Sequence, residues 1–268
     1  MTDIHAHFLT GVDDGASDFG VTTAMLAMAA ADGITEMVAT PHANLQFQFD
    51  RPRCQAELSR IRAGGPEVPR LHLGCEMHLT PENLHSALHD PYALTLNGKD
   101  CILVELPDVI TRHAVDPSLR MLVESGLRPI IAHAERNLYI QRHLDYAAHL
   151  VVSGCFLQIT ASSFFGAFGS GAQQAAGHFM THGIAHVVAS DAHGVDRRRP
   201  LLAKAREYVA GNFGEESAQL LFHENPQSAI HGAQIATMRP SRSSRLAFFF
   251  LGRSADAKAA IKFEDSRA

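Results

Sequence analysis

The feature that most constrains the fold is a regular alternation of two hydrophobic patterns. Short runs rich in β-branched residues predict strands, and segments with helical patterning separate them. The alternation repeats about seven times, which is typical of a parallel sheet with crossover helices. The predicted strands are Thr2–Phe8, Ile34–Thr40, Leu71–Leu79, Cys101–Leu106, Arg128–His133, Phe156–Ala161 and Ala185–Ser190.

Helices are predicted between these strands. Ser17 or Asp18 can cap the first helix, and Gly33 can end it. No GxGxxG motif follows the first strand, so a dinucleotide-binding fold has little support. We therefore expect an α/β barrel, in which functional residues lie at the C-terminal ends of the strands. The predicted helices cover residues 18–32, 50–63, 81–89, 117–125, 138–152, 172–182, 200–212 and 215–223.

Composition excludes several other classes of protein. The chain has 268 residues, of which 46% are hydrophobic, so a substantial core can form. A formal net charge of −5 argues against general affinity for nucleic acid. The four cysteines are scattered without a CxxC pair, so we expect reduced, mostly buried thiols in a cytoplasmic protein. We predict neither a signal peptide nor a transmembrane segment.

The last part of the chain differs in composition from the rest. Arg239–Arg245 is basic and rich in serine, and Leu246–Leu251 is apolar with three phenylalanines. We expect residues 1–237 to form the main domain and residues 238–268 to be a poorly ordered extension. The apolar run is too short to span a bilayer, but it leaves docking on the barrel, on a partner or peripherally on a membrane open.

Potential metal ligands follow most of the predicted strands. The first strand carries His5 and His7, whose spacing of two places both side chains on one face. Glu105 follows three apolar residues, and a carboxylate at the end of a buried strand needs a metal, an arginine or several hydrogen bonds. The other candidates at strand ends are Asp13, Asp14, His42, Glu76, His78, His133, Glu135, Asp191 and His193.

This residue set predicts a metal-dependent hydrolase. Imidazole and carboxylate ligands suit Zn, Mn or Fe, and their number exceeds what one tetrahedral zinc uses. Clustered divalent ions activate water and neutralise a phosphate. Arg136 and the triplet Arg197–Arg199 could hold phosphate oxygens, although for any member of the triplet a solvated position is an equally open interpretation.

Nucleophilic catalysis by cysteine or serine has little support. Cys75, Cys101 and Cys155 have no arginine six residues later, as a cysteine phosphate loop requires. Cys54 has Arg60 at that spacing, but both lie in a segment predicted as a helix rather than a loop. No GxSxG elbow is present either.

The ordered motifs resemble a known family. Asp3–His7, Gly11–Gly15 and Ala39–His42 are similar to the polymerase and histidinol phosphatase (PHP) superfamily. The resemblance is closer to its bacterial tyrosine-phosphatase branch, found with capsule and exopolysaccharide genes. The further matching segments are Gly74–Glu76, Val104–Pro107, Ile130–Arg136, Leu157–Thr160 and Ala189–His193.

The resemblance implies a distorted (β/α)₇ barrel of the PHP type in residues 1–237, with two to three divalent ions (Mn, Fe or Zn). It implies a phosphotyrosine protein as substrate, namely a bacterial tyrosine autokinase that controls polysaccharide synthesis. Arg136 and Arg198 would act on the phosphate, and Glu105 would bridge two ions. The implied ligand sets are His5, His7, Glu105 and Asp191 for one ion, Glu105, Glu76 and His133 for a second, and Asp14, His42 and His193 for a third.

Two departures from the family pattern leave questions open. Many relatives carry a second histidine where this chain has Ala43, and the three consecutive arginines leave Arg198 and Arg199 unseparated. A PHP phosphatase acting on a small ester such as histidinol phosphate, or on a nucleotide, is an alternative. So is a non-catalytic metal-stabilised module that binds a kinase or polymerase.

Overall fold

Parallel strands form the centre of the molecule. The computed structural model describes residues 1–64, 69–107 and 112–239. One sheet has the order β1 (Thr2–Ala6), β2 (Glu36–Ala39), β4 (Arg70–Leu73). The other has the order β3 (His42–Ala43), β5 (Glu76–His78), β6 (Cys101–Glu105), β7 (Arg128–Ile131), β8 (Phe156–Thr160), β9 (Val187–Ala189).

Two of the seven strand positions are divided into two strands: the second continues past its predicted end at Thr40, and the third is broken inside its predicted range. Pro41 separates β2 from β3, because proline cannot donate a backbone hydrogen bond to the neighbouring strand. Gly74 and Cys75 separate β4 from β5. A Cβ atom on Gly74 would lie 2.6 Å from Leu96 Cδ2, so the chain needs glycine at this close approach. Each broken strand contributes one half to each sheet.

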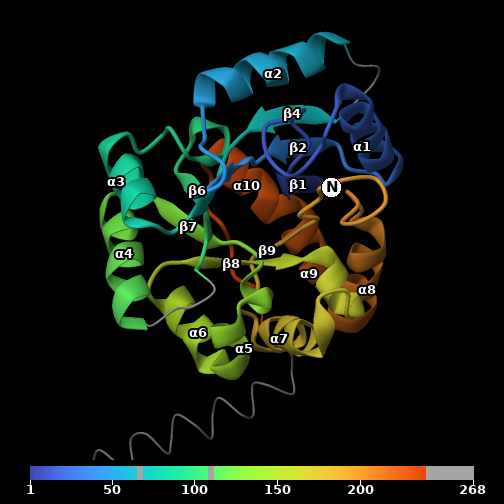
Figure 1. Cartoon of the computed structure of the whole chain (residues 1–268). Helices are drawn as coiled ribbons and strands as arrows, with labels where there is room; N and C mark the ends of the chain where they lie inside the picture. Colours follow the sequence, from blue (N-terminus) through green and yellow to red (C-terminus); the bar gives the residue numbers. More distant parts are fainter. Residues whose placement is uncertain (65–68, 108–111, 240–268) are drawn as a thin grey trace, which may run out of the picture.

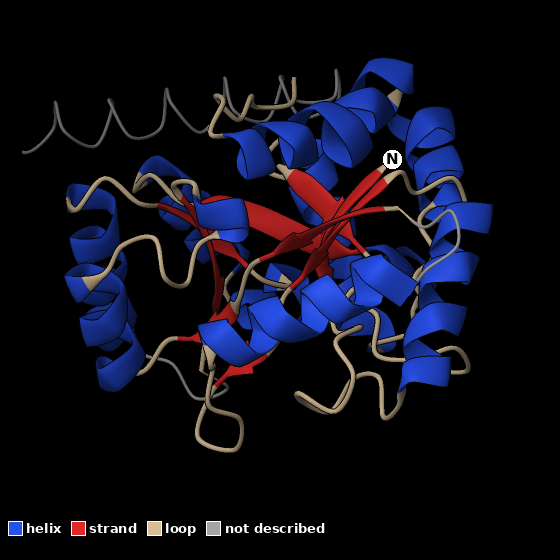
Figure 2. Ribbon diagram, turned by 90° about the horizontal axis from the view of Figure 1, so that it is seen from above, coloured by secondary structure: helices blue, strands red, loops and turns tan. Residues whose placement is uncertain are grey.

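The two sheets close into a ring through the first and last strands. His7 N donates to Ala192 O at 2.8 Å, and Asp191 N donates to His5 O at 2.9 Å. A parallel bridge also joins Ala6 and Ala192. The seven strand positions, two of them broken, therefore form a distorted (β/α)₇ barrel, with helices around the strands (Figures 1 and 2).

The helices mostly follow the predicted segments. Asp18 caps the first helix by accepting from Val21 N at 3.0 Å, and Thr80 caps the third by accepting from Asn83 N. The helices flanking the strands are α1 (Phe19–Ala31), α2 (Arg51–Gly64), α3 (Pro81–His89), α4 (Arg112–Glu124), α5 (Leu138–Arg142), α6 (Leu144–Val152), α7 (Gly169–His182) and α8 (Ala203–Phe213). Shorter elements are η1 (Leu96–Gly98), η2 (Ala134–Arg136), η3 (Ala161–Phe165), α9 (Glu215–Gln219) and η4 (Leu220–Glu224).

Three helix predictions were wrong in detail. The helix predicted over residues 138–152 is interrupted at His143, whose φ of −136° and ψ of 68° are not helical. Helix α4 spans Arg112–Glu124 and contains Pro117 in its interior, so proline did not mark its start. Helix α10 (Asn225–His231) was not predicted; its Ala229 and Ile230 are buried in a small apolar cluster with strand residues.

That small cluster supports the site from below. Leu103 of β6 and Val187 of β9 belong to it, and every second residue along a strand faces the same side. Glu105 continues the row of Leu103 at the C-terminal end of β6, and Asp191 lies two residues beyond the end of β9. The barrel therefore has apolar residues within the strands and candidate metal-binding residues at their C-terminal ends.

The predictions about thiols and membrane spans can be compared with the structure. All four cysteines are unpaired and buried, as expected. In the described part of the chain, no helix is long and apolar enough to cross a bilayer. The predicted extension lies outside the described residues except for Met238, which is buried against the core, and Arg239.

Candidate metal centre

The residues predicted as metal ligands gather at one end of the barrel. Ligand atoms form three overlapping groups, each with all its atoms within 4.8 Å of one another. These groups contain His7, Asp14, His42 and His193; then His5, His7 and Glu76; then His42, Glu76 and Glu105. His133 and Asp191 contact the same groups, so the fold brings all nine predicted ligands together.

Strand β1 supplies the two most deeply placed imidazoles. His5 and His7 have relative exposures of 0% and 1%, and their Nε2 atoms lie 3.2 Å apart. The other ring nitrogen of each is bound elsewhere: His5 Nδ1 to Gln158 Oε1 at 3.0 Å, and His7 Nδ1 to Asp13 Oδ2 at 2.7 Å. Both rings therefore direct Nε2 toward the centre of the cluster.

Glu76 lies between the imidazoles. Its carboxylate is fully buried, and Oε2 lies 3.2 Å from His5 Nε2, 3.3 Å from His7 Nε2 and 3.0 Å from His42 Nδ1. Its second oxygen lies 2.8 Å from His133 Nε2. One carboxylate thus faces four histidines.

Glu105 occupies a more peripheral position. Its side chain is 26% exposed; Oε2 lies 3.0 Å from His78 Nδ1, and Oε1 lies 3.7 Å from His133 Nε2. The family resemblance implied that Glu105 joins His5 and His7 and bridges two ions. That assignment stays a prediction; in the structure, the Glu76 carboxylate lies within 3.3 Å of the Nε2 atoms of His5 and His7.

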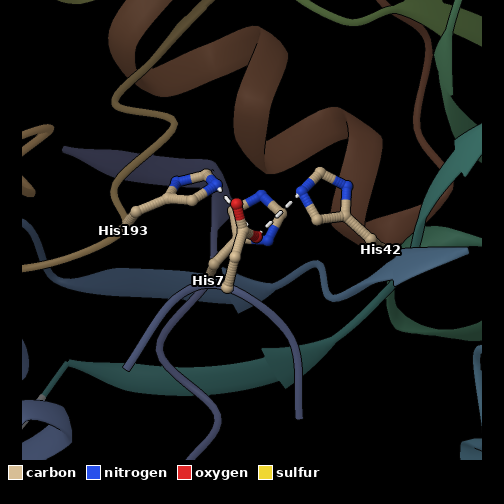
Figure 3. Close-up of side chains that lie close together, drawn as sticks. His7, His42 and His193 are labelled. Atoms are coloured by element: carbon tan, nitrogen blue, oxygen red, sulfur yellow. Dashed lines mark ion pairs between the residues drawn. The ribbon is translucent and has the colours of Figure 1, made fainter. Parts of the chain in front are cut away.

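The outer group combines three histidines with a loop carboxylate. The rings of His7, His42 and His193 converge in Figure 3. Asp14 Oδ1 lies 3.2 Å from His42 Nε2 and 3.6 Å from His193 Nε2. The Asp14 side chain is 51% exposed, so this part of the cluster is open to solvent.

Asp191 connects the cluster to two arginines. Its Oδ1 lies 3.3 Å from His5 Nε2, whereas Oδ2 accepts from both Arg136 Nη1 and Arg198 Nη2. Arg199, in contrast, is exposed, and so the structure separates the two arginines that the sequence could not. His133, Asp191 and Arg198 have φ of 32°, 53° and 48°, in the left-handed region that costs non-glycine residues energy.

Three polar residues that the sequence analysis did not single out as positioning groups hold the ligands in place. Asp13, noted only as a possible ligand, binds His7 and also accepts from His42 N at 3.2 Å. Gln158 Oε1 binds His5 and accepts from His133 N at 2.9 Å. Asp3 accepts from the backbone N–H groups of His5 and Ser190, joining β1 to the loop after β9. A polar residue inside an otherwise apolar strand, such as Gln158, was the available signal.

The loop after β1 depends on a glycine. Asp13 Oδ1 accepts from Gly15 N at 3.0 Å, which folds the loop back over β1. A Cβ atom on Gly15 would lie 2.0 Å from His7 O, so no other residue fits here without moving the ligand.

The pKa values of two histidines of the cluster are shifted in opposite directions. Burial alone would lower the pKa of His7, but hydrogen bonds to Asp13 and Glu76 outweigh it and raise the pKa to about 10. Burial and the nearby His7 charge lower the pKa of His193 to about 2. Burial would raise the pKa of Glu76, but His5 and His133 hold it well below its usual value.

The residues fit divalent cations. Several buried atoms have no hydrogen-bond partner among the described residues, and four of them face the cluster: His42 Nδ1, Glu76 Oε2, Asp191 Oδ1 and His193 Nε2. Lone pairs buried without donors are costly unless a cation binds them. A set of imidazole and carboxylate donors suits Zn, Mn or Fe. The nine ligands exceed the need of one ion.

Comparison with known proteins agrees with this geometry. Residues 1–231 match the family model described as capsular polysaccharide synthesis, CpsB/CapC. The chain is 32% identical over 255 residues to the tyrosine-protein phosphatase YwqE of Bacillus subtilis (strain 168), covering 93% of this chain and 99% of the relative. It is 28% identical over 239 residues to the tyrosine-protein phosphatase CpsB of Streptococcus pneumoniae, covering 86% and 98%.

A solved structure extends the similarity to three dimensions. It belongs to the crystal structures of YwqE from Bacillus subtilis and CpsB from Streptococcus pneumoniae, which are described as unique metal-dependent tyrosine phosphatases. The TM-score is 0.79 at 30% identity, over 90% of this chain and 100% of that chain. The matched family model spans every residue of the metal cluster. The chain therefore belongs to the CpsB/CapC family of capsular polysaccharide synthesis proteins.

Proposed function

We propose that this chain is a metal-dependent protein-tyrosine phosphatase that hydrolyses phosphotyrosine on a bacterial tyrosine kinase controlling capsule or exopolysaccharide synthesis. The observation that carries the proposal is the buried Glu76 carboxylate facing four histidines, beside two arginines that meet on Asp191. Family membership and the names of the relatives support the same activity.

We assign the ligands to three ions of Mn, Fe or Zn. His5, His7, Glu76 and Asp191 would hold the first, and Glu76 would be shared with a second held by Glu105 and His133. Asp14, His42 and His193 would hold the third. These sets follow the distances around Glu76 and differ from those implied by the resemblance only in the identity of the bridging carboxylate.

The chemistry of hydrolysis divides between the ions and the protein. Bound divalent ions lower the pKa of a coordinated water and neutralise phosphate charge. Arg136 and Arg198 each have a planar fork of donors, and their shared partner Asp191 Oδ2 holds them at the mouth of the cluster. A phosphate dianion would draw both guanidinium groups from Asp191, fixing the ester for attack without a phosphoenzyme.

The cellular setting forms part of the proposal. We propose action in the cytoplasm on the phosphorylated kinase, with no role for nucleic acid. Peripheral membrane association through residues 240–268 stays a prediction, because these residues lie outside the described part of the chain.

Metal-by-metal reconstitution tests the proposal. The chelated protein would be loaded separately with Mn, Fe or Zn and assayed on a tyrosine-phosphorylated peptide and on histidinol phosphate. We expect at least one metal to restore peptide hydrolysis, with higher kcat/KM on the peptide. Preference for histidinol phosphate would favour the small-ester alternative. Full activity after complete chelation would contradict the mechanism, and inactivity with every metal would favour a binding module.

A further inference from the structure

A basic cavity lies directly beside the metal cluster. It has a volume of about 520 Å³ and lies between η3 and the loop that joins β9 to α8. Ser190 and Arg198 line it, and Arg198 also bonds to the ligand Asp191. Arg136 stacks 4.1 Å from the ring of Phe168, another lining residue. The cavity therefore begins one side chain away from the metal ligands.

The charged side chains lining this cavity are all basic. Arg197, Arg199 and Lys204 join Arg198 in the wall, and no aspartate or glutamate lines it. Arg197 and Arg199 are exposed and form no ion pair with any described residue. Lys204 Nζ lies 4.3 Å from the centre of the Phe165 ring, which fixes one cation against an aromatic wall. Such a positive site is notable in a chain with a net charge of −5.

A second cavity on the other side of the cluster has a different character. It has a volume of about 460 Å³ and is lined by Phe47, which stacks on the ligand His42, and by Leu94 and Glu82. Arg51, its one basic lining residue, donates to Ala93 O at 2.6 Å. The two sides of the metal centre are therefore unequal, and only one offers unpaired cations.

We infer that the Arg197–Arg199–Lys204 cavity is a subsite for acidic residues that flank the phosphotyrosine of the substrate. This inference rests on the proposed phosphatase function. A peptide advances about 3.5 Å per residue when extended, so residues next to a tyrosine phosphate bound at the metals reach the neighbouring cavity. Carboxylates there would pair with Arg197 and Arg199, while Arg198, which bonds to Asp191 in this structure, would bind the phosphate.

The test compares two phosphotyrosine peptides that differ only in their flanking residues, glutamates in one and glutamines in the other. We expect kcat/KM to favour the glutamate peptide by about tenfold, the sum of two or three partly exposed ion pairs. The preference should reside in KM, since the flanking contacts are equal in the ground and transition states. It should shrink at high salt.

The Arg197→Gln/Arg199→Gln double variant should bring the ratio of the two kcat/KM values close to one. Arg70→Gln/Arg120→Gln removes the same two charges from exposed positions outside the cavity and should keep the wild-type ratio. Equal hydrolysis of both peptides by the wild type would overturn the inference, as would an unchanged ratio in the Arg197/Arg199 variant. Failure to hydrolyse either peptide, or p-nitrophenyl phosphate, would instead overturn the proposed phosphatase function on which the inference depends.

Discussion

The metal centre has an inner and an outer part that are built differently. The inner part (His5, His7, Glu76 and Asp191) is at most 1% exposed. Asp13, Gln158 and the two arginines hold these ligands by hydrogen bonds. The outer part (Asp14, His42, His193 and Glu105) includes side chains exposed by 51% and 26%. We infer from this difference that burial and hydrogen bonds from neighbouring residues hold the inner ligands in position before any ion binds.

The largest effect should come from the carboxylate that joins the two parts. Glu76→Gln removes the charge that faces four histidines, and we expect kcat/KM on p-nitrophenyl phosphate to fall by about 1000-fold, roughly 4 kcal/mol. Glu105→Gln, at the partly exposed edge, should cost about tenfold less. Metal content per chain, measured alongside the rates, should fall further for Glu76→Gln. The reverse order of the two variants would break the inner–outer distinction.

The next effect concerns the arginines at the boundary. Arg198→Gln should lower kcat/KM by about 100-fold, the cost of one donor aimed at developing charge. Arg199→Gln should cost less than about fivefold on the same small substrate, because Arg198, and not the exposed Arg199, donates to Asp191. Steady-state kinetics with p-nitrophenyl phosphate would measure both. Equal losses would mean that both arginines serve the phosphate.

A smaller effect should follow from loosening an inner ligand without touching its coordinating atom. Gln158→Leu removes the acceptor that orients His5 and His133, and we expect metal affinity to fall by roughly tenfold. Gln158→Glu keeps an acceptor oxygen at the same place and should retain most of the affinity. Competition with a chromogenic chelator measures both constants. A purely structural role for Gln158 would instead lower the thermal midpoints of both variants and leave their metal affinities unchanged.

The smallest effect concerns the number of protons that the protein releases when it binds metal. His7 has a pKa of about 10 without metal, so it is protonated at neutral pH and must lose that proton to bind an ion. Metal affinity should therefore rise with pH up to about 10. His193, with a pKa of about 2, has no proton to lose. Calorimetry in buffers of different ionisation enthalpy should show fewer protons released by His7→Asn than by wild type, and no such decrease for His193→Asn.

Much of this centre could be predicted from the sequence, and the reasons are local. His5 and His7 share a face of one strand because strand periodicity is two, and Glu105 and Asp191 follow short apolar runs that were predicted as strands. The order of the motifs then placed all of them at one end of a barrel. The same logic located Arg136 and the arginine triplet near the site.

Other features of the site could not be predicted, because they depend on contacts between residues that are far apart in the sequence. Glu76 begins the second half of the broken third strand, and the histidines that it faces come from other parts of the chain, His5 and His7 from β1 and His42 from β3. Gln158 lies 25 residues from His133, whose backbone N–H it accepts. Arg198 differs from Arg199 in its bond to Asp191 and in its positive φ, and both are properties of the folded loop.

The most direct test of the account is a crystal structure of the metal-loaded protein, with ions located by anomalous scattering. We predict that two of the three ions each bind an oxygen of Glu76 at about 2.0–2.2 Å, and that one of these two is also bound by His5 and His7. Ions bridged by Glu105 while Glu76 binds one or none would contradict the central claim that Glu76 organises this centre.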